Sequence, residues 1–265
     1  MKNRKGLLLL FISILLLLLA GCAPKAPKIT LTIGASPVPH AELLNLVKSD
    51  LAKDGLELKI VEFTDYVMPN AALLYGDIDA NFTQHLPYLN SNPEWAEKLR
   101  PAFGVHIEPF GLYSRRHKSI ADLPDGALIA IPNDPTNGGR ALLLLEAHKL
   151  IALRKGAGLK ATEKDIAVNP RKFKFRALEA AQLPRALINV DAAAINGNYA
   201  LDAGLNPVKD SLVIEGADSP YVNIVAVRSG QENDPRILAL QKALLSPKVK
   251  KHIEATYHGG VVAVF

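Results

Sequence analysis

The chain has 265 residues and a formal net charge of +5, and 49% of its residues are hydrophobic. Three of the 31 basic residues and none of the 26 acidic ones precede Cys22, so the rest of the chain has 28 basic and 26 acidic residues, a charge of only +2. Its Lys and Arg side chains are scattered and do not interleave with aromatic residues, which argues against a nucleic-acid-binding surface. About 240 residues remain, enough for one large or two small cores.

The N-terminal segment has the pattern of a secretory signal. Lys2, Arg4 and Lys5 precede an apolar run from Gly6 to Leu19, and small residues follow directly. The run is shorter than the roughly 18 residues that a membrane-spanning helix needs. Residues 1–21 are therefore predicted to be a cleaved signal peptide, with an uncleaved anchor helix as the alternative.

Cys22 is the only cysteine, so it has no partner for an internal disulfide. The sequence Leu-Ala-Gly-Cys that ends at Cys22 resembles the bacterial lipobox, which implies lipidation of this cysteine, by diacylglyceryl and acyl groups such as palmitate. Several acyl chains together anchor a protein far better than one. Residues 22–28 would be the lipidated cysteine and an extended tether that holds the folded body off the membrane.

From residue 29 onward, short apolar runs alternate with helical patterns, which indicates an α/β protein with a mostly parallel sheet. In the first part we expect a strand at 29–35, a helix at 40–53, a strand at 56–63, a short helix at 68–75 closed by Gly76, and a strand at 77–82. Further on we expect strands at 127–131, 172–178, 190–195 and 221–228, and helices after Asp134, at 179–187, after Asn196, at 235–245 and at 247–257.

Two extended segments, 106–116 and 212–228, lack a helical period. If both cross between the same two lobes, they form a two-segment hinge. Lobe 1 would then contain residues 29–112 and 220–265, and lobe 2 residues 113–219. Because small-molecule sites favour domain interfaces, we expect a ligand cleft between the lobes.

The stretch "IPNDPTNGGRALLLLEAHKL" joins a strand to a helix. Asp134 is a good helix cap and Pro135 suits the first helical position. Gly138 and Gly139 cost the helix roughly 1 kcal/mol each, which makes sense if a ligand or backbone must approach closely. Arg140 is a two-pronged donor suited to a carboxylate, and phosphate is disfavoured because the G-x-x-x-x-G-K-[ST] loop is absent. The alternative is a capped helix with a surface arginine.

Two further groups are candidate ligand contacts. Tyr66, His85 and Tyr88 offer rings to an apolar, polarisable ligand tail such as a thioether, with ordinary core packing as the alternative. We expect His85 and Tyr88, three residues apart, on one side of a helix. The asparagines at 196, 198 and 223 follow or lie in predicted strands and offer both a donor and an acceptor to an amino acid, although single asparagines often serve turns or caps.

Enzyme chemistry has little support. The motifs G-x-S-x-G and H-E-x-x-H and the dinucleotide-binding glycine pattern are absent, so we predict neither an enzyme nor a cofactor. A metal-carrying lipoprotein is the second hypothesis, with His40, His85 and His106 as possible ligands.

Eight segments run in order from Gly34 to Arg228: "GASPVPHAELL", "DYVMPNAALLYGDIDAN", "QHLPYL", "HIEPFGLYS", "AIPNDPTNGGRALLLLE", "LEAAQLPRAL", "AINGNYA" and "SPYVNIVAVR". Together they resemble the methionine-binding lipoproteins of bacterial ABC importers, the MetQ/NlpA family. The resemblance implies a type II-like periplasmic-binding-protein fold, in which two α/β lobes close on a ligand. It places the family's ligand residues on Arg140 for the carboxylate, on Asn198 and Asn223, on Tyr66 and Tyr88 around the thioether, and on His85.

One position departs from the family pattern. Where the family has a phenylalanine before Gln-His, this chain has Thr83. Because residues alternate sides along a strand, we expect that Phe82 does not replace the missing ring. The exchange removes about 1 to 3 kcal/mol of ligand contact and adds a hydroxyl, which leaves room for a bulkier or more polar ligand.

The prediction is therefore a monomeric, lipid-anchored substrate-binding protein of the bacterial cell envelope that faces the periplasm or the exterior. It would bind a free amino acid, L-methionine or a close analogue, and deliver it to an ABC permease and its ATPase. The alternatives are a lipoprotein that binds zinc or manganese, and an envelope scaffold without a small ligand.

Overall fold

The computed structural model describes residues 29–216 and 219–265. The predicted signal peptide, lipidated cysteine and tether at 1–28 lie outside the described residues. Among the residues that are described, no helix combines the length and the hydrophobicity that crossing a bilayer requires.

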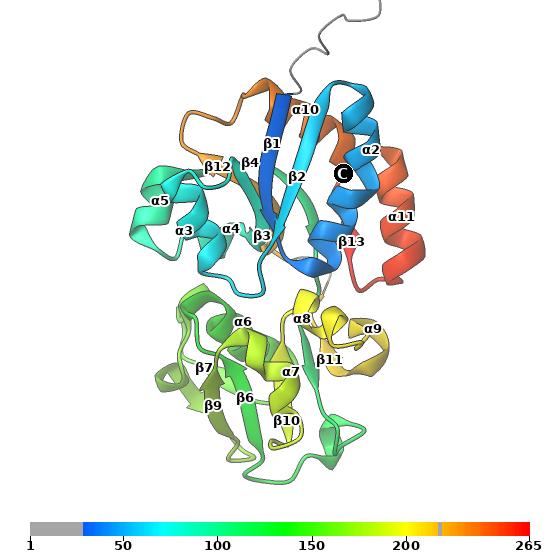
Figure 1. Ribbon diagram of the computed structural model, residues 1–265. Helices are drawn as coiled ribbons and strands as arrows, with labels where there is room; N and C mark the ends of the chain where they lie inside the picture. The colour runs from blue at the N-terminus through cyan, green and yellow to red at the C-terminus, as the bar shows by residue number, and fades with distance from the viewer. Residues whose placement is uncertain (1–28, 217–218) are drawn as a thin grey trace, which may run out of the picture.

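The chain forms two α/β lobes, one above the other in Figure 1, and each is built on its own sheet. The sheet of the first lobe has the strand order β13 (Val262–Ala263), β4 (Leu99–Ile107), β12 (Val222–Arg228), β3 (Ala80–His85), β1 (Ile29–Ala35), β2 (Leu56–Glu62). The sheet of the second lobe has the order β11 (Ser211–Ile214), β5 (Gly111–Tyr113), β10 (Ala192–Ile195), β6 (Leu128–Pro132), β9 (Lys174–Leu178), and β7 (Ala152–Leu153) pairs separately with β8 (Ile166–Val168). The α/β fold class predicted from the sequence is confirmed.

Helices cover both faces of each sheet. The first lobe contains η1 (Pro37–Ala41), α2 (Glu42–Lys53), α3 (Met68–Tyr75), α4 (Leu86–Leu89), α5 (Pro93–Lys98), α10 (Pro235–Leu244) and α11 (Pro247–Tyr257). The second lobe contains η2 (Ile120–Asp122), α6 (Pro135–Ala147), η3 (Gly158–Lys160), η4 (Glu163–Asp165), η5 (Ala180–Gln182), α7 (Leu183–Ala186), α8 (Gly197–Asp202) and α9 (Pro207–Asp210). In the second lobe α6 packs in one core cluster and α7 in another, so the sheet lies between two apolar layers.

The apolar pattern of the strands explains this layering. In β1 the side chains of Leu31, Ile33 and Ala35 are fully buried in the main core of the first lobe. In the edge strand β2, buried Leu56 and Leu58 alternate with exposed residues. Because side chains alternate between the two faces of a strand, every second residue of this edge strand lies on the face that the helices cover.

The predicted order of elements agrees with the structure, but two predictions were wrong. The sheets are mixed rather than mostly parallel, because the parallel pairs are β1 with β2, β1 with β3, β10 with β6 and β6 with β9, and the other neighbours pair antiparallel. The return strand β12 enters between β3 and β4 and is antiparallel to both. The third strand begins at Ala80 rather than Asp77, because the Asp77 amide donates back to the Ala72 carbonyl and completes the end of α3.

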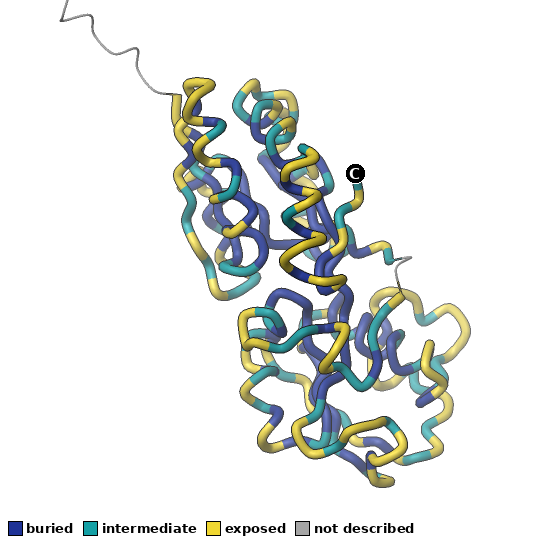
Figure 2. The backbone as a smooth tube through the Cα atoms, turned by 90° about the vertical axis from the view of Figure 1, so that its right-hand side faces the viewer, coloured by how far each residue is buried: buried dark blue, intermediate teal, exposed yellow. Residues whose placement is uncertain are grey.

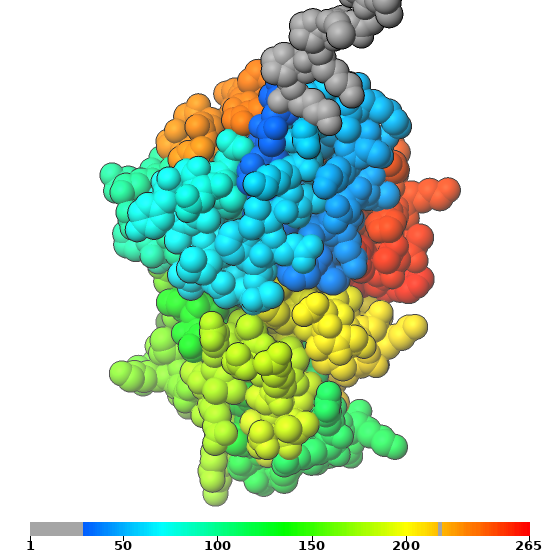
Figure 3. All heavy atoms as spheres, in the orientation of Figure 1, coloured from blue at the N-terminus to red at the C-terminus, as the bar shows by residue number. Residues whose placement is uncertain are grey.

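The chain passes from the first lobe to the second after β4, and β12 belongs to the first lobe again after β11 of the second. Figure 2 shows the two lobes from the side. The two crossings are hydrogen-bonded to each other, since the Glu215 amide donates to the Phe110 carbonyl at 2.8 Å. The predicted boundary at residue 112 lies inside β5, a strand of the second sheet. On the face shown in Figure 3 the two lobes meet along a seam. The Tyr199 hydroxyl of the second lobe donates to the Thr64 carbonyl of the first at 3.1 Å.

Gly138 and Gly139 serve the backbone of the fold. A Cβ at Gly139 would lie 2.3 Å from the Leu159 carbonyl oxygen, and one at Gly138 would lie 2.9 Å from the Pro132 carbonyl oxygen. Of the two explanations offered by the sequence, a close ligand or a close backbone, the structure supports the backbone. The two glycines let α6 pack against β6 and η3.

Replacing Gly139 by alanine should therefore destabilise the protein. Alanine gains up to about 1 kcal/mol of helix propensity, but the clash with a backbone carbonyl should cost more, for a net loss of about 1 to 2 kcal/mol in the free energy of unfolding. Chemical denaturation measures this change. The matched control is Gly216→Ala, where a Cβ meets no described atom within 4 Å, and equal effects of both substitutions would contradict the packing argument.

Candidate functional site

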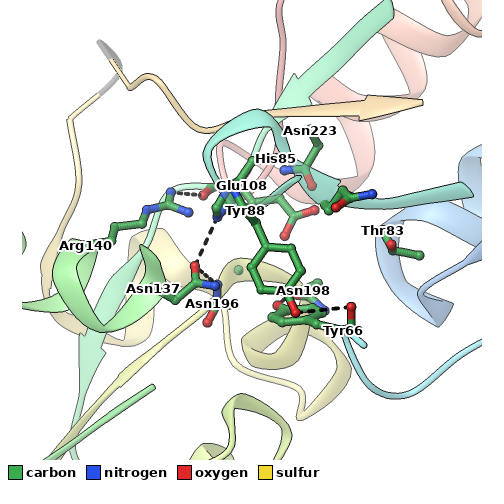
Figure 4. Close-up of a pocket in the computed structure, with 12 residues that line it drawn as sticks. Tyr66, Thr83, His85, Tyr88, Glu108, Asn137, Arg140, Asn196, Asn198 and Asn223 are labelled. Carbon is green, nitrogen blue, oxygen red and sulfur yellow. Dashed lines mark hydrogen bonds between the residues drawn. The ribbon is translucent and has the colours of Figure 1, made fainter. Parts of the chain in front are cut away.

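A pocket lies between the two lobes. All seven ligand-binding residues predicted from the sequence line it: Tyr66, Thr83, His85, Tyr88, Arg140, Asn198 and Asn223 (Figure 4). Five more residues complete the wall: Gln84, Glu108, Asn137, Asn196 and Gly197. Of these five, only Asn196 was a candidate ligand contact from the sequence. The structure thus brings together side chains from β3, β12, α6, α8 and the first crossing.

Arg140 is buried rather than on the surface, with 3% of the residue exposed. Its Nε donates to Glu215 Oε1 at 3.0 Å, and its Nη2 donates to Glu215 Oε2 and to the Glu108 carbonyl. The guanidinium carbon also lies 4.1 Å from the centre of the Tyr221 ring. The two-pronged edge expected to meet a ligand carboxylate is therefore paired with Glu215. No residue in the described part of the chain accepts a hydrogen bond from Nη1, which leaves this nitrogen available.

Asn198 and Asn223 both have their side-chain oxygen in use. The Tyr66 hydroxyl donates to Asn198 Oδ1 at 2.6 Å, and His40 Nε2 lies 3.1 Å from Asn223 Oδ1. Each amide therefore keeps its Nδ2 group, which is only a donor, for other partners. The bond between Tyr66 and Asn198 also links the two lobes across the pocket.

Aromatic rings form one end of the pocket. The Tyr66 and Tyr88 ring centres are 5.7 Å apart in an edge-to-face arrangement, and the Tyr88 hydroxyl donates to the Tyr66 carbonyl at 3.2 Å. The expectation that His85 and Tyr88 share one side of a helix was wrong. His85 ends β3 and caps α4, and its Nδ1 accepts a hydrogen bond from the Tyr88 amide at 3.1 Å.

Thr83 lies at a bulge in β3. Ile224 of β12 pairs with Gln84 and Val225 pairs with Phe82, so Thr83 has no partner in this ladder. Thr83 lines the pocket, whereas Phe82 packs into the core with its ring 4.5 Å from the His40 ring. Phe82 therefore does not supply a ring to the pocket at this position.

Glu108 follows β4 at the first crossing and is 5% exposed. Its Oε1 lies 2.8 Å from His106 Nε2 and 3.4 Å from His40 Nε2. Burial alone would raise the pKa of Glu108, but its electrostatic interaction with His40, the hydrogen bond from His106 and the backbone amide of Asn198 lower it below the usual value. The result is a carboxylate held ionised in the wall of the pocket. The sequence held only a weak signal for it, an acidic residue in the extended segment "HIEPFG".

The histidines of the metal hypothesis are only partly brought together. His40 and His106 join Glu108 in a buried group whose possible ligand atoms lie within 4.8 Å of one another, but His85 instead bonds Asn137 through Nε2 at 3.1 Å. Histidines that bind a metal usually donate the other ring N–H to a partner. Among the described residues, neither Nδ1 has one. The group therefore fits a hydrogen-bond network around Glu108 better than a metal site.

His40 and His85 are buried and neutral. Burial lowers the pKa of His40 from 6.5 to about 4, and burial followed by the charge of Arg140 lowers the pKa of His85 from 6.5 to about 3. The folded protein resists protonation of both rings, whereas the unfolded chain takes up these protons below pH 6.5.

Acidification should therefore destabilise the protein, because both folded pKa values lie below the unfolded ones. The stabilisation is complete above about pH 6.5 and falls by up to about 1.4 kcal/mol per pH unit for each histidine until the folded pKa is reached. Urea denaturation at pH 7.5 and pH 5 should show a loss of about 2 to 4 kcal/mol. His85→Gln should reduce this slope, and a pH-independent free energy of unfolding would contradict the assignment.

Comparison with known proteins places the chain in a family. The model of the NlpA lipoprotein family matches residues 31–265. The chain is 44% identical over 235 residues to membrane lipoprotein TpN32 of Treponema pallidum, with 88% of each chain covered. It is 40% identical over 271 residues to methionine-binding lipoprotein MetQ of Bacillus subtilis, with 96% of this chain and 98% of the relative covered.

Solved structures agree with this match. A nutrient-binding protein from Burkholderia cenocepacia, bound to methionine, superposes with a TM-score of 0.85 at 47% identity and covers 89% of this chain and 100% of its own. Lipoprotein Tp32 from Treponema pallidum superposes with a TM-score of 0.86 at 42% identity, over 89% of this chain and 100% of its own. The chain therefore belongs to the NlpA lipoprotein family.

Proposed function

We propose that this protein is the substrate-binding component of an ABC importer and that it binds L-methionine or a close analogue. The observation that carries the proposal is the pocket between the lobes, which holds a buried guanidinium from Arg140 and a buried carboxylate from Glu108. Two opposite charges in one enclosed wall fit a zwitterion, because each buried ligand charge would meet a partner of opposite sign.

The polarity of the pocket suggests how an amino acid lies in it. The donors Arg140 Nη1, Asn198 Nδ2 and Asn223 Nδ2 suit the carboxylate, since none of them has an accepting atom left to offer. Glu108 suits the protonated amine. In this arrangement the bond of Arg140 with Glu215 persists when the ligand binds, so the ligand carboxylate meets one prong of the guanidinium rather than two.

The ring-lined end of the pocket suits the ligand side chain. Tyr66 and Tyr88 present apolar ring surface, against which a thioether sulfur packs favourably. The support for methionine itself comes from relatives: the Burkholderia cenocepacia protein is bound to methionine, and the Bacillus subtilis relative is named for binding it. Thr83 adds a hydroxyl to the pocket lining, so an oxidised or otherwise more polar analogue is the natural competitor.

Binding across the two lobes provides a signal for transport. The pocket residues Tyr66 and His85 come from the first lobe, and their partners Asn198 and Asn137 come from the second. A ligand that touches both lobes stabilises the closed arrangement over the open one, because its contacts are complete only when the lobes meet. The permease and its ATPase would respond to that closed form.

The remaining parts of the proposal concern the whole protein. We infer that it acts as a monomer by binding alone, without catalysis, and that lipidation of Cys22 anchors it to a bacterial membrane. The folded body would then face the periplasm or the exterior, within reach of the permease.

Arg140→Ala tests the function and the site together. Calorimetric titration with L-methionine should show one binding site in the wild-type protein and an affinity loss of about 2 to 4 kcal/mol in the variant, because the carboxylate loses its charged partner. Because Glu215 also loses its partner, Arg140→Ala/Glu215→Gln serves as a second variant. Arg236→Ala, which removes a distant ion pair with Asp79 and Asp234, is the control.

Two results would contradict the proposal. A wild-type protein that gives no response to methionine or to any other amino acid would refute the function. An unchanged affinity in a folded Arg140→Ala variant would remove Arg140 from the site and leave the function standing.

A further inference from the structure

Asn196 has a buried side-chain oxygen with no partner in the described part of the chain. The residue precedes α8, is 5% exposed and lines the pocket (Figure 4). Its Nδ2 donates to Asn137 Oδ1 at 2.8 Å, but no described residue donates to its Oδ1. An unpaired buried acceptor costs about 1 to 3 kcal/mol, so such an atom in a pocket wall indicates a ligand donor.

The orientation of this amide is fixed by a chain of hydrogen bonds that starts at Asp134. A carboxylate only accepts, and both Asp134 oxygens lie 3.0 Å from Asn137 Nδ2, so Asn137 must turn its NH₂ group toward Asp134. Its Oδ1 then faces Asn196 and His85. Asn196 has to present its own NH₂ group to that oxygen, which turns Asn196 Oδ1 the other way.

The hydrogen bonds of His85 independently support this orientation of Asn137 and Asn196. Its Nδ1 accepts from the Tyr88 amide, so the neutral ring carries its proton on Nε2. That proton is donated to Asn137 Oδ1 at 3.1 Å. Asn137 Oδ1 therefore accepts from both neighbours, and a flipped Asn196 amide would set two oxygens against each other.

We propose that Asn196 Oδ1 accepts a hydrogen bond from the protonated amine of the bound amino acid, with Asp134 and Asn137 as positioning residues. The inference rests on the proposed function and assigns a further residue that selects for the α-amine. Asn196 has a free hydrogen-bond acceptor for the ligand, whereas Asn198 and Asn223 have free donors. It also adjoins Gly197, where an added Cβ would lie 2.6 Å from Glu108 Cβ, so the backbone next to Asn196 packs closely against Glu108.

The test compares L-methionine with 4-(methylthio)butanoate, which has the same carboxylate and side chain but no amine. In Asn196→Ala the affinity for methionine should fall about 10-fold, because one charge-assisted hydrogen bond is lost, while the affinity for the desamino compound stays the same. The preference for the amine therefore shrinks by the same factor. Calorimetry measures the affinity for L-methionine, and competition at millimolar concentration measures the affinity for 4-(methylthio)butanoate.

Asn198→Ala is the matched control, two residues along the same turn. Because Asn198 presents a donor, its loss should weaken both ligands equally and leave the preference for the amine unchanged. Asn196→Ser keeps a hydroxyl that can donate to Asn137 Oδ1 and still accept from the amine, so it should retain more of the preference than alanine, and it provides a second readout if the alanine variant does not fold.

A folded Asn196→Ala variant that keeps the wild-type preference would overturn the inference, and so would an equal loss for both ligands. A wild-type protein that binds neither compound would refute the proposed function, and with it the role of Asn196. Binding of methionine with an unchanged preference in the variant refutes only the role of Asn196.

Discussion

The site depends on one buried charge, the guanidinium of Arg140. A cation removed from water is stable only with well-placed partners, and Arg140 finds them on both crossings between the lobes. Glu215 follows β11 and accepts from Nε and Nη2, while the Glu108 carbonyl follows β4 and accepts from Nη2. Tyr221, which precedes β12, covers the guanidinium. The start of α6 is thereby tied to the hinge, and the one nitrogen that remains is available to a ligand.

The polarity of the pocket is set by residues behind its wall. His40 Nε2 is hydrogen-bonded to Asn223 Oδ1. Asp134 orients the side chain of Asn137, which in turn orients the side chain of Asn196. Each amide thus shows the pocket a single kind of hydrogen-bonding group. Because buried polar groups are costly when unpaired, this arrangement favours a ligand with a carboxylate and an amine in a fixed order. Neutral His85 belongs to the same chain of bonds and adds no charge.

Local patterns in the sequence predicted most of the helices and strands, because periodicity, caps and glycines act over a few residues. Local patterns also pointed to Arg140 at the start of a helix and to Asn196 and Asn198 directly after a strand. The missed features depend on distant contacts. Glu108 becomes a pocket carboxylate only because His40 and His106 fold around it. Glu215 gave no local sign that it would pair with Arg140, 75 residues away. The antiparallel return of β12 and the late start of β3 were missed because sheet pairing is decided outside the strand itself.

A crystal structure with bound L-methionine would test this account most directly. The account predicts the ligand carboxylate within hydrogen-bond reach of Arg140 Nη1, the amine toward Glu108, and the thioether against Tyr66 and Tyr88, with the bond between Arg140 and Glu215 intact. A ligand bound in the reverse order, or one whose carboxylate lies away from Arg140, would contradict it.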